Sequence, residues 1–322
     1  MAFDVSALTA YVEENRAELI MKPITTSRSF DFLDLRTGIK SGEKIPIIES
    51  TAPAQAGASC GFTSSGSTTI TQTTLNTSYI KVQEALCLQD LEAYYTQKYL
   101  KPGSSPDTTE IAADIINRKL ANISQKVGQM IWQGKTSYTN DTYLKQINGF
   151  IAAIDTAGDA VAATAQASIS TSTVRGIFED IVFQKLPMAI TSQKPIVFCG
   201  VDTLRILLQK FMIDNMYHVV PSGADYGKNE FVYPGTDVRI IGLHEMNANN
   251  SVDSGGSLPT AVKNRIIAGD MMNFVAGVDV KADMDNFDVW YSKDNRQLRF
   301  DLRFNIGVKN HWTDQIVQYT NT

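Results

Sequence analysis

The chain has 322 residues, 43% of them hydrophobic, and a formal net charge of −5 at pH 7. This length exceeds the size at which one hydrophobic core usually stops growing, so we expect two domains, or one domain with large excursions. The acidic balance and the lack of any run of basic residues argue against a protein that binds nucleic acid by neutralising phosphates.

Cysteine usage and the N-terminal residues indicate the cellular compartment. Cys60, Cys87 and Cys199 are widely spaced and form no CxxC pair, which favours a reducing compartment without a disulfide framework. The N-terminal stretch carries acidic residues where a signal peptide would carry positive charge. No apolar run approaches the ~20 residues of a membrane span. We therefore expect synthesis in the cytoplasm and no membrane partner.

The first predicted elements are a helix and a long uncharged segment. The helix starts at Asp4 and ends before Pro23. No charged residue lies between Glu49 and Lys81, and the middle of this segment is built almost wholly of Ala, Gly, Ser and Thr. Composition alone is typical of a flexible linker. The Ile-rich and Thr-rich flanks favour two strands of one projecting hairpin. Such a hairpin would be prone to aggregation unless another chain covered it.

A long helix follows. Residues 79–88 continue as a strand, and residues 90–100 have the pattern of a short amphipathic helix. Asp107 and Glu110 form a capping box at the start of the next helix. The apolar residues Ile116, Leu120, Ile123, Val127 and Met130 step by four and three along one face of it. The helix should end at Gln133, with Gly134 as its C-terminal cap, and span roughly 35 Å at ~1.5 Å per residue.

The second half of the chain alternates helices and strands. A helix over 172–186 ends at Pro187, and a buried strand over 195–199 precedes a helix that Asp202 should cap. Residues 238–241 form another strand, and residues 246–260 form a polar loop. This order predicts a small α/β domain inserted between the long helix and the last strands.

A hairpin is predicted near the end of the chain. Apolar and other residues alternate without a break from Leu298 to Val308, which predicts a strand with one buried face and one face toward solvent or a partner. The strand at 289–292 precedes it, and Asp294 and Asn295 tolerate the tight turn between them. We interpret this hairpin as part of the structural framework and not as part of a chemical site.

Sequence support for a phosphate-binding, metal-binding or catalytic motif is weak. Gly134-Lys135-Thr136 lacks the glycine that a phosphate-binding loop needs five positions earlier, and a helix precedes it instead of a strand. The three histidines, His218, His244 and His311, lack the spacing of metal ligands. Neither a GxSxG nor an HExxH pattern occurs. We therefore predict no catalytic residues, no cofactor and no metal site.

In their order and spacing, the elements resemble those of the major capsid protein of tailed double-stranded DNA bacteriophages, over essentially the whole chain. The residues that carry the resemblance are Trp132-Gln133-Gly134 with Ile147-Asn148-Gly149-Phe150, Pro195-Ile196-Val197-Phe198, Ile267-Ala268-Gly269-Asp270-Met271, and the alternating run 298–308 followed by 312–317.

The resemblance implies the α+β fold of that family, with an antiparallel sheet over a long spine helix. The implied parts are an N-terminal arm at 1–35, an extended β-hairpin loop at 36–75, a peripheral domain at 76–150 and 266–322, and an inserted axial α/β domain at 151–265. It also implies subunit-interface residues in the extended loop, namely Ile39, Ile47, Phe62 and Ile70.

The function implied is a non-enzymatic shell subunit that assembles through hexamers and pentamers into an icosahedral or prolate capsid around a double-stranded DNA genome. Its location would be the virion, after synthesis in the bacterial host cytoplasm. The implied partners are the subunit itself, a portal protein, DNA held without sequence-specific contacts, and optionally a decoration protein. Many family members carry an N-terminal scaffolding segment, whereas here the arm starts at once, so we expect a separate scaffolding protein.

Two alternatives remain open. A bacterial encapsulin shell has the same fold but encloses enzymes, so packaged DNA or cargo protein would discriminate the two. A cytosolic α/β enzyme would need a concave site with converging polar groups in the 217–262 region.

Overall fold

The computed structural model describes residues 27–39, 42–55, 57, 64–87, 108–138, 142–187, 190, 195–214, 229–247, 264–279, 287–292, 294, 295 and 297–321. The helices expected at 4–22 and 90–100, the capping residue Asp107 and most of the loop expected at 246–260 lie outside these residues.

A five-stranded sheet is organised around one long strand, β12 (Gln297–Asn310). Its antiparallel partners are β4 (Ser78–Cys87), β10 (Phe274–Val278) and β11 (Phe287–Ser292), and β1 (Asp34–Thr37) pairs in parallel with β10. The alternation expected between residues 298 and 308 is confirmed, because every even-numbered residue of the run is buried. The β11–β12 hairpin with its turn at 294 and 295 is likewise confirmed.

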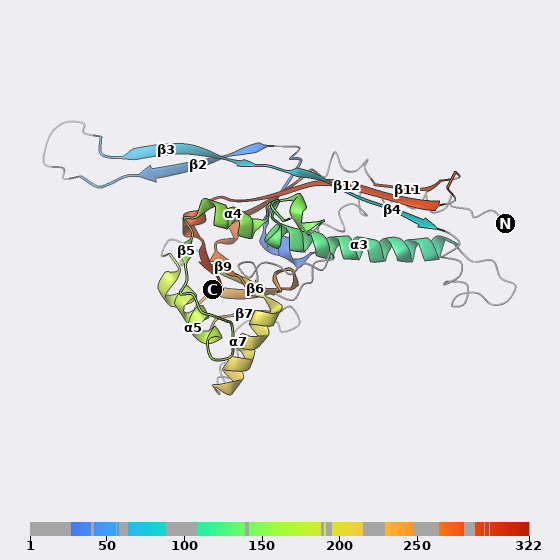
Figure 1. The fold of residues 1–322 in the computed structure, drawn as a ribbon. Helices are drawn as coiled ribbons and strands as arrows, with labels where there is room; N and C mark the ends of the chain where they lie inside the picture. The colour runs from blue at the N-terminus through green and yellow to red at the C-terminus, as the bar shows by residue number, and fades with distance from the viewer. Residues whose placement is uncertain are drawn as a thin grey trace.

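The long helix α3 (Thr108–Gln133) runs beneath this sheet (Figure 1). Its apolar stripe from Ile116 to Met130 belongs to the same hydrophobic core as Phe300, Leu302 and Phe304 of β12. The helix ends at Gln133 as expected, and the amide of Gly134 donates a hydrogen bond to the carbonyl of Met130 at 3.0 Å. The helix and the sheet therefore bury their apolar faces against one another.

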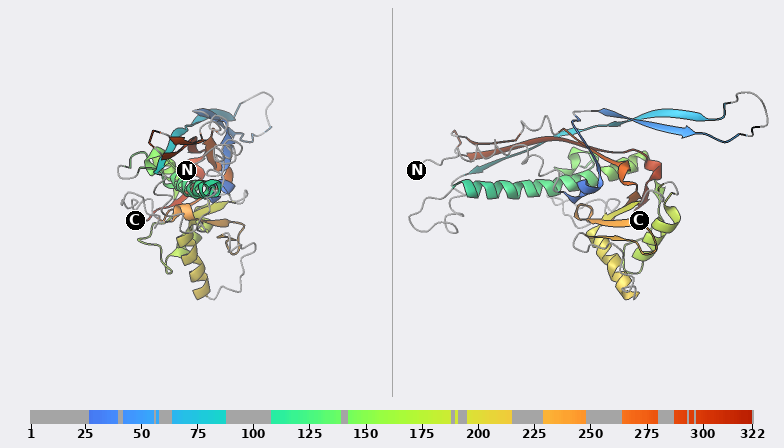
Figure 2. Two further views of the ribbon diagram at one scale, coloured as in Figure 1. Left: turned by 90° about the vertical axis from the view of Figure 1, so that its right-hand side faces the viewer. Right: turned by 180° about the vertical axis from the view of Figure 1, so that it is seen from behind.

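A six-stranded sheet lies on the other side of this core. Its strand order is β5 (Val161–Ala162), β13 (Val317–Tyr319), β9 (Ile266–Gly269), β6 (Ile196–Gly200), β8 (Arg239–Leu243) and β7 (Glu230–Val232). The central strand β6 is buried on both faces: Ile196 and Phe198 join the first core, whereas Val197 and Cys199 join a second core. The second core is covered by α5 (Val174–Glu179), the π-helical turn η3 (Asp180–Lys185) and α7 (Val201–Ile213), which Figures 1 and 2 show at the end of the molecule away from the first sheet.

The strands β9 and β13 fall in the expected range 266–322, and both pair within the sheet of β6. The chain reaches β13 after it leaves β12 through the 3-10 helix η8 (Thr313–Gln315). The expectation that Asp202 caps α7 is wrong. The helix begins at Val201 after Gly200, and the carboxylate of Asp202 accepts a hydrogen bond from the amide of Thr203 inside the first turn.

Short helical elements connect these layers. They are η1 (Arg28–Phe32), η2 (Leu144–Gln146), α4 (Phe150–Ala157), η6 (His244–Met246) and η7 (Met271–Asn273). All of them except η7 contribute to the first core.

Four aromatic side chains meet where these layers join. Trp132 lies 5.1 Å from Phe150, 5.0 Å from Phe198 and 6.0 Å from Phe274, measured between ring centroids. They come from α3, α4, β6 and β10, and all four are fully buried. The indole nitrogen of Trp132 donates a hydrogen bond to the hydroxyl of Ser29 at 2.9 Å. This aromatic junction therefore holds elements of both sheets together.

The hairpin of β2 (Glu43–Thr51) and β3 (Ser67–Leu75) projects from this body as a separate two-stranded ribbon. Figures 1 and 2 show it reaching beyond the body, on the side opposite to the far end of α3. The expected pair of strands on either side of the uncharged segment is therefore confirmed.

Replacement of Trp132 by alanine should lower the free energy of unfolding by about 3–5 kcal/mol, because it leaves a cavity at the junction of the layers. The control Trp290→Ala, at a side chain that is 40% exposed, should cost about 1 kcal/mol or less. Guanidinium denaturation followed by far-ultraviolet circular dichroism measures both. Equal losses for the two variants would contradict the role given to the junction.

Candidate assembly surface

The projecting hairpin is exposed over most of its length. Nine residue pairs join its strands in register, from Glu43 opposite Leu75 to Thr51 opposite Ser67. Every described residue from 48 to 72 is exposed. Hydroxyl groups bond across the two strands, with 3.1 Å between Ser50 and Thr68 and 2.8 Å between Thr51 and Ser67. This part of the hairpin therefore contributes nothing to the cores of its own chain.

An apolar pair stands on the exposed part of the hairpin. Ile48 and Ile70 face each other across the strands and are 64% and 65% exposed. Large exposed aliphatic side chains without charged neighbours are typical of surfaces that another chain covers. The pair is therefore the strongest candidate contact on this ribbon.

The four predicted interface residues lie in different surroundings. Ile70 is exposed, whereas Ile39 and Ile47 are buried by their own chain, with 6% and 9% exposure. Phe62 lies outside the described residues. The role of these four residues at an interface stays a prediction. Sequence reasoning missed Ile48, which has the same residue type as Ile47 but the opposite strand parity, and therefore points to the other face of the ribbon.

The edges of the ribbon are also available. Among the described residues, β2 and β3 pair only with each other. An isolated two-stranded ribbon is marginally stable in water, and its outer edges retain unpaired peptide groups. Contact with another chain would stabilise the ribbon and would pair the peptide groups of its outer edges.

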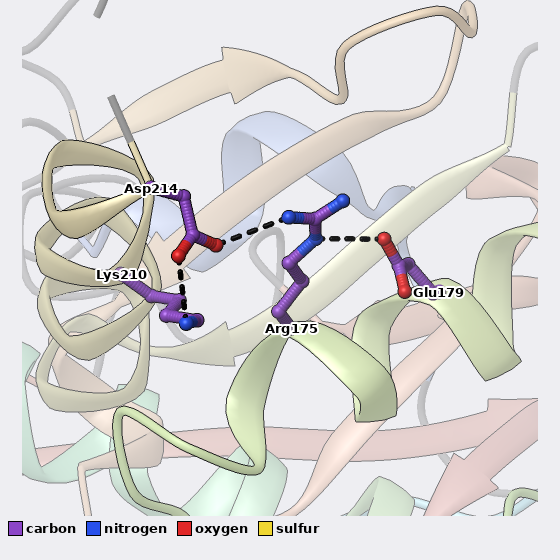
Figure 3. Close-up of polar contacts among 4 residues, drawn as sticks. All are labelled: Arg175, Glu179, Lys210 and Asp214. Carbon is purple, nitrogen blue, oxygen red and sulfur yellow. Dashed lines mark hydrogen bonds and ion pairs between the residues drawn. The ribbon is translucent and has the colours of Figure 1, made fainter. Parts of the chain in front are cut away.

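An ionic network links α5 to the end of α7 (Figure 3). The pKa values of two of its members, Arg175 and Asp214, are shifted. Arg175 lies 2.8 Å from the carboxylate of Glu179 and 3.0 Å from that of Asp214, and Lys210 lies 2.8 Å from Asp214. Hydrogen bonds from Lys210 and then Arg175 hold the pKa of Asp214 below its ordinary value, and the bond to Glu179 is the main cause that raises the pKa of Arg175.

Such shifts also occur in catalytic sites. Here the four groups neutralise one another, and the network joins α5 to the end of α7 across 39 residues of sequence. It is therefore a structural link between two helices.

Cys199, His244 and Glu245 are further described residues with side chains of catalytic type. Burial raises the pKa of the Cys199 thiol, so this cysteine is a weak nucleophile. His244 is exposed, while the neighbouring Glu245 is buried and accepts a hydrogen bond from Ser27 at 2.7 Å. In the described part of the chain, no group of three or more His, Cys, Asp or Glu residues could hold a metal ion. His218 lies outside that part.

The helices of the described residues include none that is long and apolar enough to cross a membrane.

Comparison with known proteins decides the fold. No protein-family model matches the sequence, and no curated protein matches it. Among solved structures, the capsid of the cyanophage P-SCSP1u matches with a TM-score of 0.51 and 10% identity, over 91% of this chain and 88% of that one. The capsid of an empty GTA particle matches with a TM-score of 0.54 and 10% identity, over 92% and 90%. The satellite phage P4 procapsid, which includes a size determination protein, matches with a TM-score of 0.53 and 9% identity, over 97% and 99%.

The chain has the tailed-phage major capsid fold. At these identities the likeness concerns the fold, and each match spans more than nine-tenths of this chain. The neighbours are capsid proteins rather than enzymes.

The ionic network should contribute stability that depends on pH. Because the pKa of Asp214 is lowered in the folded protein, its contribution is complete above the ordinary value of 3.8 and is lost as the pH falls below it. The free energy of unfolding of Asp214→Asn should therefore be lower than that of the parent near neutral pH and approach it in acid. Urea denaturation at several pH values tests this. Asp159→Asn, at an exposed carboxylate outside the network, is the control. A difference in the free energy of unfolding between the parent and Asp214→Asn that stays constant with pH would contradict the lowered pKa of Asp214.

Proposed function

We propose that this protein is the structural major capsid protein of a tailed bacteriophage, and that it assembles with itself into a closed icosahedral or prolate shell around double-stranded DNA. The single observation that carries the proposal is a capsid fold whose projecting hairpin is exposed at every described residue from 48 to 72, with no charged residue between Glu49 and Lys81. A shell subunit needs several contacts with its neighbours, and each of them can be weak.

On this proposal, residues 36–75 are the extended loop that lies on a neighbouring copy, and residues 1–35 are the N-terminal arm. Residues 76–150 and 266–322 form the peripheral domain, and residues 151–265 form the axial domain. Because β9 and β13 pair with β6, the two proposed domains share one sheet and the aromatic junction. We expect them to move as one unit.

The proposed partners follow from the shell. Copies of the chain would form hexamers and pentamers, a portal protein would occupy one vertex, and a separate scaffolding protein would guide assembly in the host cytoplasm. A decoration protein is an optional further partner. The formal charge of −5 suits a wall that does not bind the genome tightly, because a strongly basic lining would bind the polymer before assembly finished.

Electron microscopy and nucleic-acid analysis of particles isolated from infected cells test the function. We expect closed shells that contain DNA resistant to added nuclease until the shell is opened. Shells that hold a cargo protein and no DNA would support an encapsulin-type compartment instead. A chain that stays monomeric under all assembly conditions would contradict both.

The apolar pair of the hairpin gives a test at the level of residues. The double variant Ile48→Asp with Ile70→Asp should keep the circular dichroism of the parent subunit, because both side chains are exposed, but should form few closed shells. The control Ile48→Val with Ile70→Val keeps the apolar surface and the β-branched shape, and should assemble. Sedimentation velocity and negative-stain microscopy measure the fraction in shells. Parental shell yield from the aspartate variant would show that this pair makes no essential contact.

A further inference from the structure

A small hydrophobic cluster lies at the base of the hairpin, apart from the two large cores. It consists of Ile39, Ile45, Leu75 and Val275, and all four side chains are buried. Ile45 and Leu75 belong to the two strands of the hairpin, Val275 belongs to β10, and Ile39 follows β1. The cluster therefore joins the ribbon to one face of the five-stranded sheet, at its inner strand β10.

Two glycines lie at this junction. Gly277 of β10 and Gly307 of β12 are directly opposite each other in the antiparallel register, so they lie on the same face of the sheet. A Cβ at Gly277 would lie 2.7 Å from Cδ2 of Leu75 and 3.0 Å from Cδ1 of Ile39. A Cβ at Gly307 would collide with the backbone carbonyl of Asn76, where the chain passes from the hairpin to β4. The paired glycines therefore leave a socket that the base of the hairpin fills.

Backbone hydrogen bonds hold the other side of the base. The amides of Gly38 and Ile39 both donate to the carbonyl of Val278, at 2.9 Å and 3.2 Å. Gly38 has a φ of +85°, which a residue with a side chain rarely adopts. The chain therefore enters the hairpin from a fixed point and leaves it through the socket.

We propose that this socket, formed by Gly277 and Gly307 and filled by the Ile39, Ile45, Leu75 and Val275 cluster, sets the direction in which the hairpin projects, and that this direction determines whether shells close. The second part rests on the proposed function. One further described contact lies at the same base, where Arg36 of β1 is 4.0 Å from the carboxylate of Glu43. Every described residue from 48 to 72 is exposed, so among the described residues the direction of the hairpin is set at its base.

The length of the ribbon makes the base important. A strand of nine residues spans about 30 Å at ~3.3 Å per residue, so a tilt of about 10° at the base moves the far end by about 5 Å. A displacement of that size exceeds what a packed contact tolerates, because interfaces match the packing density of protein interiors. A subunit with a loose base would still fold, but its hairpin would meet the neighbouring copy in varying positions.

Spin labels on the full-length chain measure the direction. Ketone-bearing unnatural residues at the exposed positions Thr69 and Asn122 carry the labels, which avoids the native cysteines. Labelled subunits are diluted with unlabelled ones so that pulsed electron paramagnetic resonance reports only distances within one chain. Shell yield is measured on the same samples by sedimentation velocity and negative-stain microscopy.

Two variants perturb the socket and two matched controls do not. Ile45→Ala removes part of the cluster from the hairpin side, and Gly307→Ala displaces the chain at Asn76. Ile213→Ala is the same truncation at a side chain of α7 that is 58% exposed and lies outside the hairpin, and Gly176→Ala adds a methyl group where no atom lies within 4 Å. Ile45→Ala keeps the test decisive even where Gly307→Ala fails to fold, because its side chain belongs to the ribbon and to neither large core.

We expect a narrow distance distribution in the parent and in both controls. Ile45→Ala and Gly307→Ala should give a shifted or broadened distribution and a loss of most closed shells. Parental distributions in both socket variants would overturn the proposal, as would altered distributions with a parental yield of closed shells. If the parent itself forms no shells, the proposed function fails, and the distance measurement alone still decides whether the socket sets the direction of the hairpin.

Discussion

The aromatic contact of Trp132 with Phe150, Phe198 and Phe274 is the interaction on which the body of the protein depends. Each ring comes from a different element, and β6 and β10 lie far along the chain from the neighbouring helices α3 and α4. Because the rings pack at one point, the end of α3, the start of α4, the central strand of one sheet and an inner strand of the other are fixed relative to one another. The body is consequently a single packed unit in which both sheets share the first core.

No residue of β2 or β3 belongs to either large core, so the packing of the body does not depend on the hairpin. Its outer part buries nothing against its own chain, carries no charge beyond Glu49, and presents Ile48 beside Ile70. A surface of that kind is a liability for a protein that works alone, since exposed uncharged strands associate. It is an advantage for a protein whose task is to contact copies of itself. The socket at Gly277 and Gly307 connects the two parts, because it gives a rigid direction to a ribbon that has little stability of its own.

Periodicity predicted the elements that have one buried face. The stripe from Ile116 to Met130 and the alternation from Leu298 to Val308 each specified an element type and its buried side, and the structure confirms both. The strand β9 is buried on both faces and β13 has only three residues, so neither carries an alternation from which its pairing in the sheet of β6 could be predicted. The parity of Ile47 and Ile48 on the hairpin depends on strand register, which a loop without alternating residues does not reveal. The pairing of Gly277 with Gly307 depends on a register between two strands whose sequence shows only two ordinary glycines.

The central claim is that the exposed part of the hairpin is covered by another copy of the chain in a closed shell. A cryo-electron microscopy reconstruction of assembled particles, at a resolution that shows side chains, tests it most directly. The account predicts that Ile48 and Ile70 are buried against a neighbouring subunit, with the hairpin leaving its own body in the direction set by the socket. A closed shell in which the hairpin is exposed to solvent, or is folded back onto its own body, would contradict it.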